Sequence, residues 1–212
     1  MVSLPHLLAF ALASIALIAL PGPTVLFVIG RSLALGRRGG ILSVAGNALG
    51  LIPVIVAVAL GLGAIVAQSV VIFTIIKFAG AAYIVFLGIQ AIRHRRSAVG
   101  ATGVAMAPKS RRRLVAEGFV VGVSNPKSIV FFIAVLPQFV DYGTGSVVAQ
   151  LLTLGMVFVV LAFIGDSTWA LAAGAARHWF AKSPRRIEHL SATGGAMMIG
   201  LGGVLAASGA RS

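Results

Sequence analysis

The chain has 212 residues, of which 59% are hydrophobic and 10% charged, and its mean hydropathy is +1.06. Soluble domains carry about 25% charged residues, so this composition excludes an ordinary soluble domain and predicts a polytopic membrane protein. The absence of cysteine excludes disulfide bonds and thiolate metal sites. The net charge of +13 raises the alternative of a nucleic-acid-binding protein, which the distribution of the basic residues tests.

Uncharged stretches of the chain are long enough to cross a membrane. They cover residues 7–30, 39–76 and 190–210, and a spanning helix needs about 20 predominantly apolar residues. Six helices fit the pattern, at about residues 5–30, 40–66, 70–92, 115–139, 147–175 and 191–208. We therefore predict an all-α membrane fold. Its first helix is expected to be retained rather than removed as a signal, because no basic region precedes it.

Two of the predicted helices are interrupted, the first by Pro21-Gly22-Pro23 and the fourth by Asn125-Pro126-Lys127. Proline has no amide hydrogen and its ring clashes with the preceding turn, so both motifs predict a broken helix. A break at membrane depth is tolerated where the freed backbone groups face a cavity or other helices. A single proline usually makes a simple kink, but paired breaks in the first and fourth helices favour a substrate site.

The basic residues gather in three loops, at about residues 31–38, 93–113 and 177–186. In a six-helix protein these loops share one side of the membrane, and an excess of Lys and Arg marks the cytoplasmic side. Both termini are therefore predicted to lie outside the cytoplasm. Charges spread over short loops do not form the single basic surface that nucleic-acid binding requires, so we predict no nucleic-acid partner.

The longest loop, residues 93–113, is predicted to be a cytoplasmic linker between two three-helix units, residues 1–92 and 114–212. Units with an odd number of helices enter the membrane from opposite sides, so we predict two inverted repeats, a plan common among secondary transporters. The segments 80–88 and 194–202 share Gly, Ala, Leu and Gly at the same four places. These residues are common in membrane helices, so this match is weak support on its own.

Several motifs occur in a fixed order along nearly the whole chain. They are Pro21-Gly22-Pro23, RSLALGRRGGILSVAGNALG (31–50), GLGAI (61–65), KFAGAAYIVFLGIQAIR (77–93), NPKSIVFFIAVLPQFV (125–140) and a glycine-rich last helix. In these motifs the chain resembles the LysE/RhtB family of amino-acid exporters. The resemblance implies a cofactor-independent secondary transporter in the bacterial inner membrane, in which an ion gradient, commonly of protons, drives the export of amino acids. Family members often place Asn after the Pro-Gly-Pro motif, whereas this chain has Thr24, which bears on the substrate.

Charged residues within predicted spans are costly and are candidates for function. Lys127 lies near the middle of the fourth helix, where it is placed to bind a substrate carboxylate or to exchange a proton. Asp166, deep in the fifth helix, is placed to bind a substrate ammonium or to carry the coupling proton. The alternative for each is a structural pairing, with one another or, for Lys127, with the freed carbonyls, because an unpaired buried charge is costly.

The predicted translocation site contains Pro21, Gly22, Pro23, Thr24, Asn47, Asn125, Pro126, Lys127 and Asp166. Coupling or gating is assigned to Lys77 and Arg37, which fall in motifs of the resemblance, and to Asp166. Few acids line the spans, which favours a neutral amino acid or close derivative, such as homoserine, threonine or leucine, over a cationic one. A channel or a passive accessory subunit is the alternative function.

The remaining polar and small residues receive structural interpretations. Glu117, at the start of the fourth helix, is predicted to favour the helix dipole. The pairs Gly46/Gly50 and Gly118/Gly122 allow close helix approach, either within the bundle or between protomers of a homo-oligomer. The four histidines lie at span ends without metal-ligand spacing or an acidic cluster, so we predict neither an enzyme nor a metal site.

Overall fold

The computed structural model describes residues 2–66, 70–93 and 110–176, together with scattered positions between 183 and 203. Within these residues the regular structure is helical and no strand occurs, which confirms the all-α prediction. The elements are α1 (Leu4–Ala19), α2 (Pro23–Val66), α3 (Val70–Arg93), α5 (Arg111–Val123), α6 (Pro126–Ala134), the 3₁₀ helix η1 (Leu136–Phe139) and α7 (Val147–Ala175).

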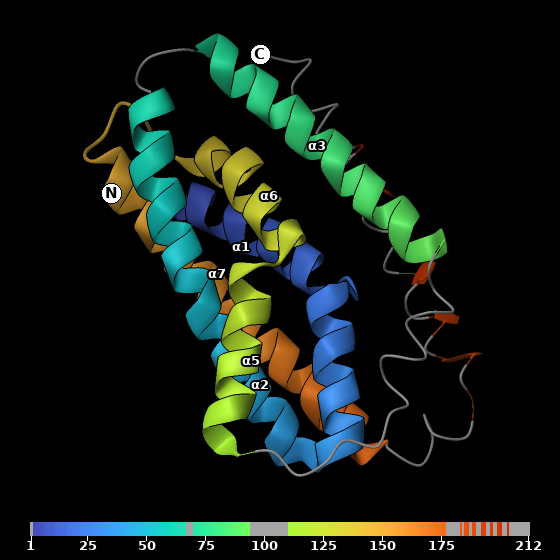
Figure 1. Ribbon diagram of the computed structural model, residues 1–212. Helices are drawn as coiled ribbons and strands as arrows, with labels where there is room; N and C mark the ends of the chain where they lie inside the picture. The colour runs from blue at the N-terminus through green and yellow to red at the C-terminus, as the bar shows by residue number, and fades with distance from the viewer. Residues whose placement is uncertain are drawn as a thin grey trace.

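The helices form an elongated bundle in which α2 packs along both α5 and α7, as Figure 1 shows. Helix α3 packs mainly on α6 and runs along one side of the bundle. Two segments are long and apolar enough to cross a membrane, Pro23–Gly61 and Val147–Ala175. A third candidate is the pair Arg111–Val123 and Pro126–Phe139, bent by 45° at its break. Only scattered residues of the predicted sixth helix are described, all of them helical, so the six-span count stays a prediction.

Both predicted helix breaks are present. Helix α1 ends at Ala19, and α2 begins at Pro23 after an extended residue, Leu20. Helix α5 ends at Val123, and α6 begins with Pro126 behind Asn125, its N-terminal cap. Proline suits the first helical position, where its missing N–H would have had no intrahelical partner. Each proline thus starts a new helix rather than kinking a continuous one.

Helix α2 consists of two halves joined at Gly36, whose φ of 76° and ψ of 178° are not helical. Residues other than glycine are strained in this region of the backbone map. The prediction that the first span ends at residue 30 was wrong, because helical structure continues to this glycine. Arg31, which the sequence placed in a loop, therefore lies within a helix. Arginine and leucine are good helix formers, and only the glycine allows the chain to turn.

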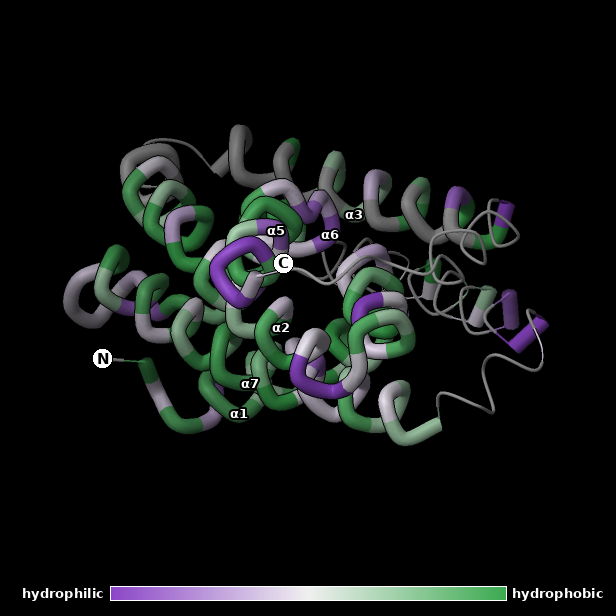
Figure 2. Tube along the Cα trace, turned by 60° about the horizontal axis from the view of Figure 1, so that its bottom comes forward, coloured by the Kyte–Doolittle hydropathy of each residue, from purple (hydrophilic) through white to green (hydrophobic). Residues whose placement is uncertain are grey.

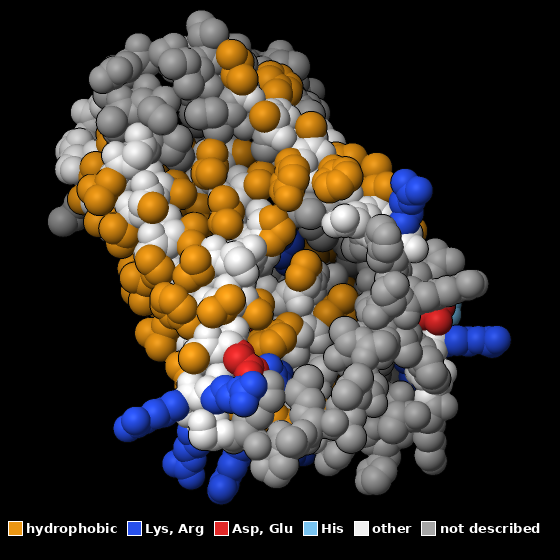
Figure 3. Space-filling model, in the orientation of Figure 1, with side chains coloured by type: hydrophobic (Ala, Val, Ile, Leu, Met, Phe, Trp, Pro, Cys, Tyr) orange, Lys and Arg blue, Asp and Glu red, His pale blue; other side chains and the backbone are white. Residues whose placement is uncertain are grey.

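Apolar side chains fill the interior and also cover much of the outside. Phe131, Phe132 and Phe158 form an aromatic cluster, in which the Phe132 and Phe158 ring centroids lie 4.8 Å apart. Hydrophobic residues also continue along outward faces of the helices in Figure 2, and Leu12 and Leu60 are more than half exposed. In Figure 3 most of the visible Lys and Arg side chains lie toward the lower end of this view, and the apolar side chains cover its upper left part. This pattern fits a bundle surrounded by lipid.

Helices α2 and α5 cross in direct backbone contact. A Cβ atom added at Gly46 or Gly50 would overlap the backbone of α5 at Val115 or Phe119. Conversely, a Cβ at Gly118 or Gly122 would overlap the backbone of α2. The two glycine pairs therefore pack against each other within one chain, which decides between the two arrangements that the sequence left open.

Gly118→Ala should destabilise the folded protein by about 1–3 kcal/mol, because its methyl group would force two packed backbones apart. The new Cβ would overlap the Ser43 carbonyl and lie 3.1 Å from the backbone nitrogen of Asn47. Gly61→Ala in α2 is the matched control, since nothing lies within 4 Å of a Cβ there. It should be neutral or slightly stabilising, because alanine is the better helix former. Thermal unfolding in detergent compares the variants, and equal melting temperatures would contradict the close crossing.

Candidate functional site

A small cavity lies where the two helix breaks meet the middle of the bundle. Its volume is about 20 Å³, room for about one water molecule. The polar residues that line it are Thr24, Asn47, Asn125, Lys127, Ser128 and Asp166. All six are buried, and they come from α2, from the cap and first turn of α6, and from α7. Apolar side chains such as Leu17, Leu51 and Phe158 complete the wall.

The Lys127 ammonium is held by the open end of α1. Its Nζ donates hydrogen bonds to the backbone oxygens of Leu17, at 3.1 Å, and Leu20, at 3.0 Å. The last carbonyls of a helix have no intrahelical donors, so the break at Pro21 supplies acceptors for a buried cation. Gly22 fits closely beside it, since a Cβ there would lie 3.1 Å from Nζ. An ammonium has three N–H donors, and two of them are used in these bonds.

Helices α2 and α6, each of which follows one of the two breaks, are joined at their N-termini. Asn125 Nδ2 donates to Thr24 Oγ1 over 2.5 Å, and Asn125 Oδ1 accepts from the Lys127 backbone N–H at 3.1 Å. The starts of α2 and α6 thus meet through a single asparagine side chain. Helix N-termini carry partial positive charge, so this end of the cavity favours an anionic group.

The Asp166 carboxylate lies on another wall of the cavity, on α7. Its Oδ2 accepts a hydrogen bond from Asn47 Nδ2 at 3.0 Å. The other amide atom, Asn47 Oδ1, is buried without a hydrogen-bond partner among the described residues. Asn47 thus both bonds across helices and lines the cavity, so it fulfils both roles that the sequence left open.

Lys127 and Asp166 line the same cavity without a direct ion pair between them in the described structure. The ammonium is bonded to backbone carbonyls and the carboxylate to the Asn47 amide. Of the structural alternatives from the sequence, the fixed pairing of these two charges is not made in the described structure, whereas the pairing of Lys127 with the freed carbonyls of the first break is present. Separate positive and negative groups on one cavity are chemically suited to a molecule that carries both charges.

The structure brings most of the predicted site together. Besides the lining residues, Pro21 and Pro23 flank Gly22 at the first break, and Pro126 starts α6 at the second. Arg37 is exposed and lies away from the cavity, with its side chain against Gly174 of α7. The side chain of Lys77 lies outside the described residues, although its backbone belongs to α3.

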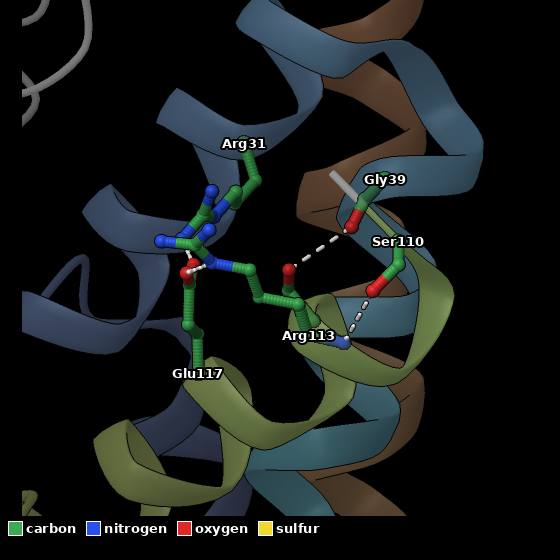
Figure 4. A network of polar contacts seen from close by, with 6 residues as sticks. Arg31, Gly39, Ser110, Arg113 and Glu117 are labelled. Atoms are coloured by element: carbon green, nitrogen blue, oxygen red, sulfur yellow. Dashed lines mark hydrogen bonds and ion pairs between the residues drawn. The ribbon is translucent and has the colours of Figure 1, made fainter. Parts of the chain in front are cut away.

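A partly buried ion pair was missed by the sequence analysis. Arg31 Nη2 is paired with Glu117 Oε2, and Arg113 Nε donates to Glu117 Oε1 at 2.9 Å (Figure 4). The side chain of Arg31 is only 5% exposed, and its guanidinium lies 5.0 Å from the Phe27 ring centroid. The prediction that Glu117 starts its helix was wrong, because α5 begins at Arg111 and has no acid in its first turn. Glu117 is held by two basic partners instead of by the helix dipole, which acts within the first turn. The sequence signal was a lone acid among basic residues, which indicates a paired carboxylate but does not name its partner.

Comparisons with known proteins agree with this arrangement. The chain matches the LysE type translocator family over residues 15–209. The chain belongs to the LysE type translocator family. This confirms the resemblance drawn from the motifs, and it identifies the chain as a membrane transport protein.

The translocator is similar in sequence to several bacterial proteins along most of its length. It is 36% identical to an uncharacterized membrane protein of Vibrio cholerae over 94% of this chain and 95% of the relative. It is 35% identical to the homoserine/homoserine lactone efflux protein of Salmonella typhimurium, with the same coverage of both chains. A leucine efflux protein of Klebsiella pneumoniae is 24% identical over 74% of this chain and 73% of its own length. No solved structure matches the chain.

Proposed function

We propose that this translocator exports a neutral amino acid, or a close derivative, from the bacterial cytoplasm as a proton-coupled secondary carrier. The observation that carries the proposal is the separation of Lys127 and Asp166 across one cavity, without a direct ion pair. Relatives named as homoserine/homoserine lactone and leucine efflux proteins support the substrate class.

A zwitterionic amino acid matches the two ends of the cavity. Its carboxylate would take the remaining N–H of Lys127 and face the joined N-termini of α2 and α6. Its ammonium would donate to the Asp166 carboxylate and to the unpartnered Asn47 Oδ1. Charge-assisted hydrogen bonds of this kind are stronger than neutral ones, so the backbone groups of the substrate would supply most of the binding.

The apolar wall suits an uncharged substrate side chain. Leu17, Leu51 and Phe158 offer no group that would pair with a second substrate charge. Burying a second charge without a partner is costly, which disfavours lysine-like substrates. The Thr24 hydroxyl and Ser128 are the neutral polar groups available for a substrate hydroxyl, as homoserine or threonine would present.

The cavity volume of about 20 Å³ is too small for an amino acid. Substrate entry would therefore require the helices to move apart, as in alternating access, whereas a channel would keep a continuous pore. We propose six spanning helices in two inverted repeats, with both termini outside the cytoplasm. The proton would be carried by Asp166, the acid that the described structure places at the cavity.

Export from cells fed a panel of dipeptides tests this proposal, with and without a protonophore. One amino acid should accumulate outside only when the translocator is expressed, and collapse of the proton gradient should stop it. Counterflow in proteoliposomes separates a carrier from the alternative of a channel or passive subunit: preloaded substrate should accelerate uptake of labelled substrate. Movement of no amino acid in the panel, or uptake without counterflow, would contradict the proposal.

A further inference from the structure

The partly buried ion pair between Arg31 and Glu117 joins the first half of α2 to α5. Arg31 belongs to the first half of α2, residues 23–35, which turns into the second half at Gly36 and also packs on it through Val28 and Val44. Glu117 belongs to α5. Figure 4 shows the arginine reaching from the first half of α2 to the carboxylate on α5.

Helix α5 and the second half of α2 form one unit because their backbones touch. Substitution of any of the four crossing glycines would drive a Cβ into the partner helix, so this crossing leaves no space for sliding. The first half of α2 makes no such glycine contact with α5. Its apolar residues Val25 and Ile29 pack on α7 instead, against Ala173 and Trp169. The ion pair thus connects the first half of α2, which has a glycine joint, to the rigid unit of α5 and the second half of α2.

The pair lies between the cavity and the basic end of the bundle. Thr24 lines the cavity, and Arg31 follows it by two helical turns on the same face, about 10 Å along the axis. Glu117 lies on the same side of the cavity, before the break that precedes Asn125. The exposed Arg37, Arg111 and Arg112 mark this end, which Figure 3 shows as the basic end.

We propose that the Arg31–Glu117 ion pair is the latch that closes the basic mouth of the cavity, and that the first half of α2 turns about Gly36 when the latch opens. This gate rests on the proposed function for its use, whereas the ion pair and the joint at Gly36 are features of the described fold. Phe27 supports the latch, because its ring faces the Arg31 guanidinium. The exposed Arg113 holds the other oxygen of Glu117 from within α5 and does not cross the mouth.

A single introduced cysteine measures the opening directly, because the chain has none of its own. Ala162→Cys places the thiol on the cavity wall, at a buried position of α7. The rate of its reaction with a small, charged, membrane-impermeant thiol reagent is measured from each face, in intact cells and in inverted vesicles. The parent with Ala162→Cys should react slowly from both faces.

Glu117→Gln in this background should raise the labelling rate by about tenfold from the basic face only, within the range typical of conformational coupling. Removal of one partner leaves a buried charge unpaired and can prevent folding. The double variant Arg31→Gln/Glu117→Gln, which leaves no charge behind, should therefore give the same increase. Exchange of the charges in Arg31→Glu/Glu117→Arg should return labelling toward the parent rate. Arg113→Gln is the matched control and should leave the rate unchanged.

Unchanged labelling in both the single and the double variant would overturn the latch, and so would an equal increase from both faces, which indicates general loosening. The labelling rate does not depend on transport. If it rises as expected while no amino acid is exported, the latch stands and the proposed function fails. If export is confirmed while labelling does not respond, the latch fails alone.

Discussion

Lys127→Ala should abolish amino-acid export while the protein still inserts into the membrane. The variant removes the cation that faces the proposed carboxylate position. It also removes the donor to the Leu20 carbonyl and one of the two donors to the Leu17 carbonyl, which keeps the Leu20 N–H at 3.2 Å. Truncation of one partner of a buried, hydrogen-bonded charge pair costs about 2–5 kcal/mol, which corresponds to a loss of about 30-fold to several thousandfold in transport rate. Export per unit of inserted protein is the measurement.

Arg38→Ala is the matched control, because Arg38 is an exposed basic residue outside the cavity. It should export normally at equal membrane levels. Lys127→Arg retains the charge in a larger, planar group, and partial export by this variant would show that charge and shape both matter. Full export by Lys127→Ala would remove Lys127 from the site.

Asp166→Asn should abolish uphill export with little effect on folding. The new amide is nearly the same size, and its oxygen can still accept the hydrogen bond from Asn47. The negative charge and the ability to carry a proton are lost. Export against a gradient should therefore fall by about 30-fold or more, because the loss of one charge from a buried pair costs about 2–5 kcal/mol.

Counterflow with Asp166→Asn distinguishes the two roles proposed for this acid. Counterflow exchanges substrate without net proton movement, so it should persist if Asp166 only carries the coupling proton. It should disappear together with export if Asp166 binds the substrate ammonium. Thr168→Val, an exposed position two residues along α7, controls for disturbance of the helix. Normal uphill export by Asp166→Asn would contradict both roles.

The helix breaks and the site could be predicted from the sequence because proline and buried charge act locally. The Pro23 and Pro126 positions determine where the second helix of each pair begins, whatever surrounds them. Lys127 and Asp166 stand out since charged residues are rare in apolar spans. These signals need no knowledge of which helices are neighbours.

The partners of these groups could not be predicted, because they depend on how the helices cross. Arg31 and Glu117 are 86 residues apart, and Asn47 and Asp166 are 119 apart. The crossing of α2 on α5 is determined by glycines that resemble the many other glycines of the chain. Gly36 was likewise hidden: its positive φ depends on the turn between two packed helix halves rather than on its neighbours in sequence.

The separated charges of Lys127 and Asp166 also bear on how the transporter responds to the membrane potential. The ionic side chains that the described structure places at the cavity add up to zero, and a zwitterionic substrate adds no net charge. Movement of one elementary charge across a potential of 100 mV involves about 2.3 kcal/mol. Neither the empty nor the loaded cavity would therefore exchange energy with the field when it changes sides. The membrane potential would act on the transport cycle only through an accompanying ion. The current measured during transport would therefore give the number of these ions that are moved.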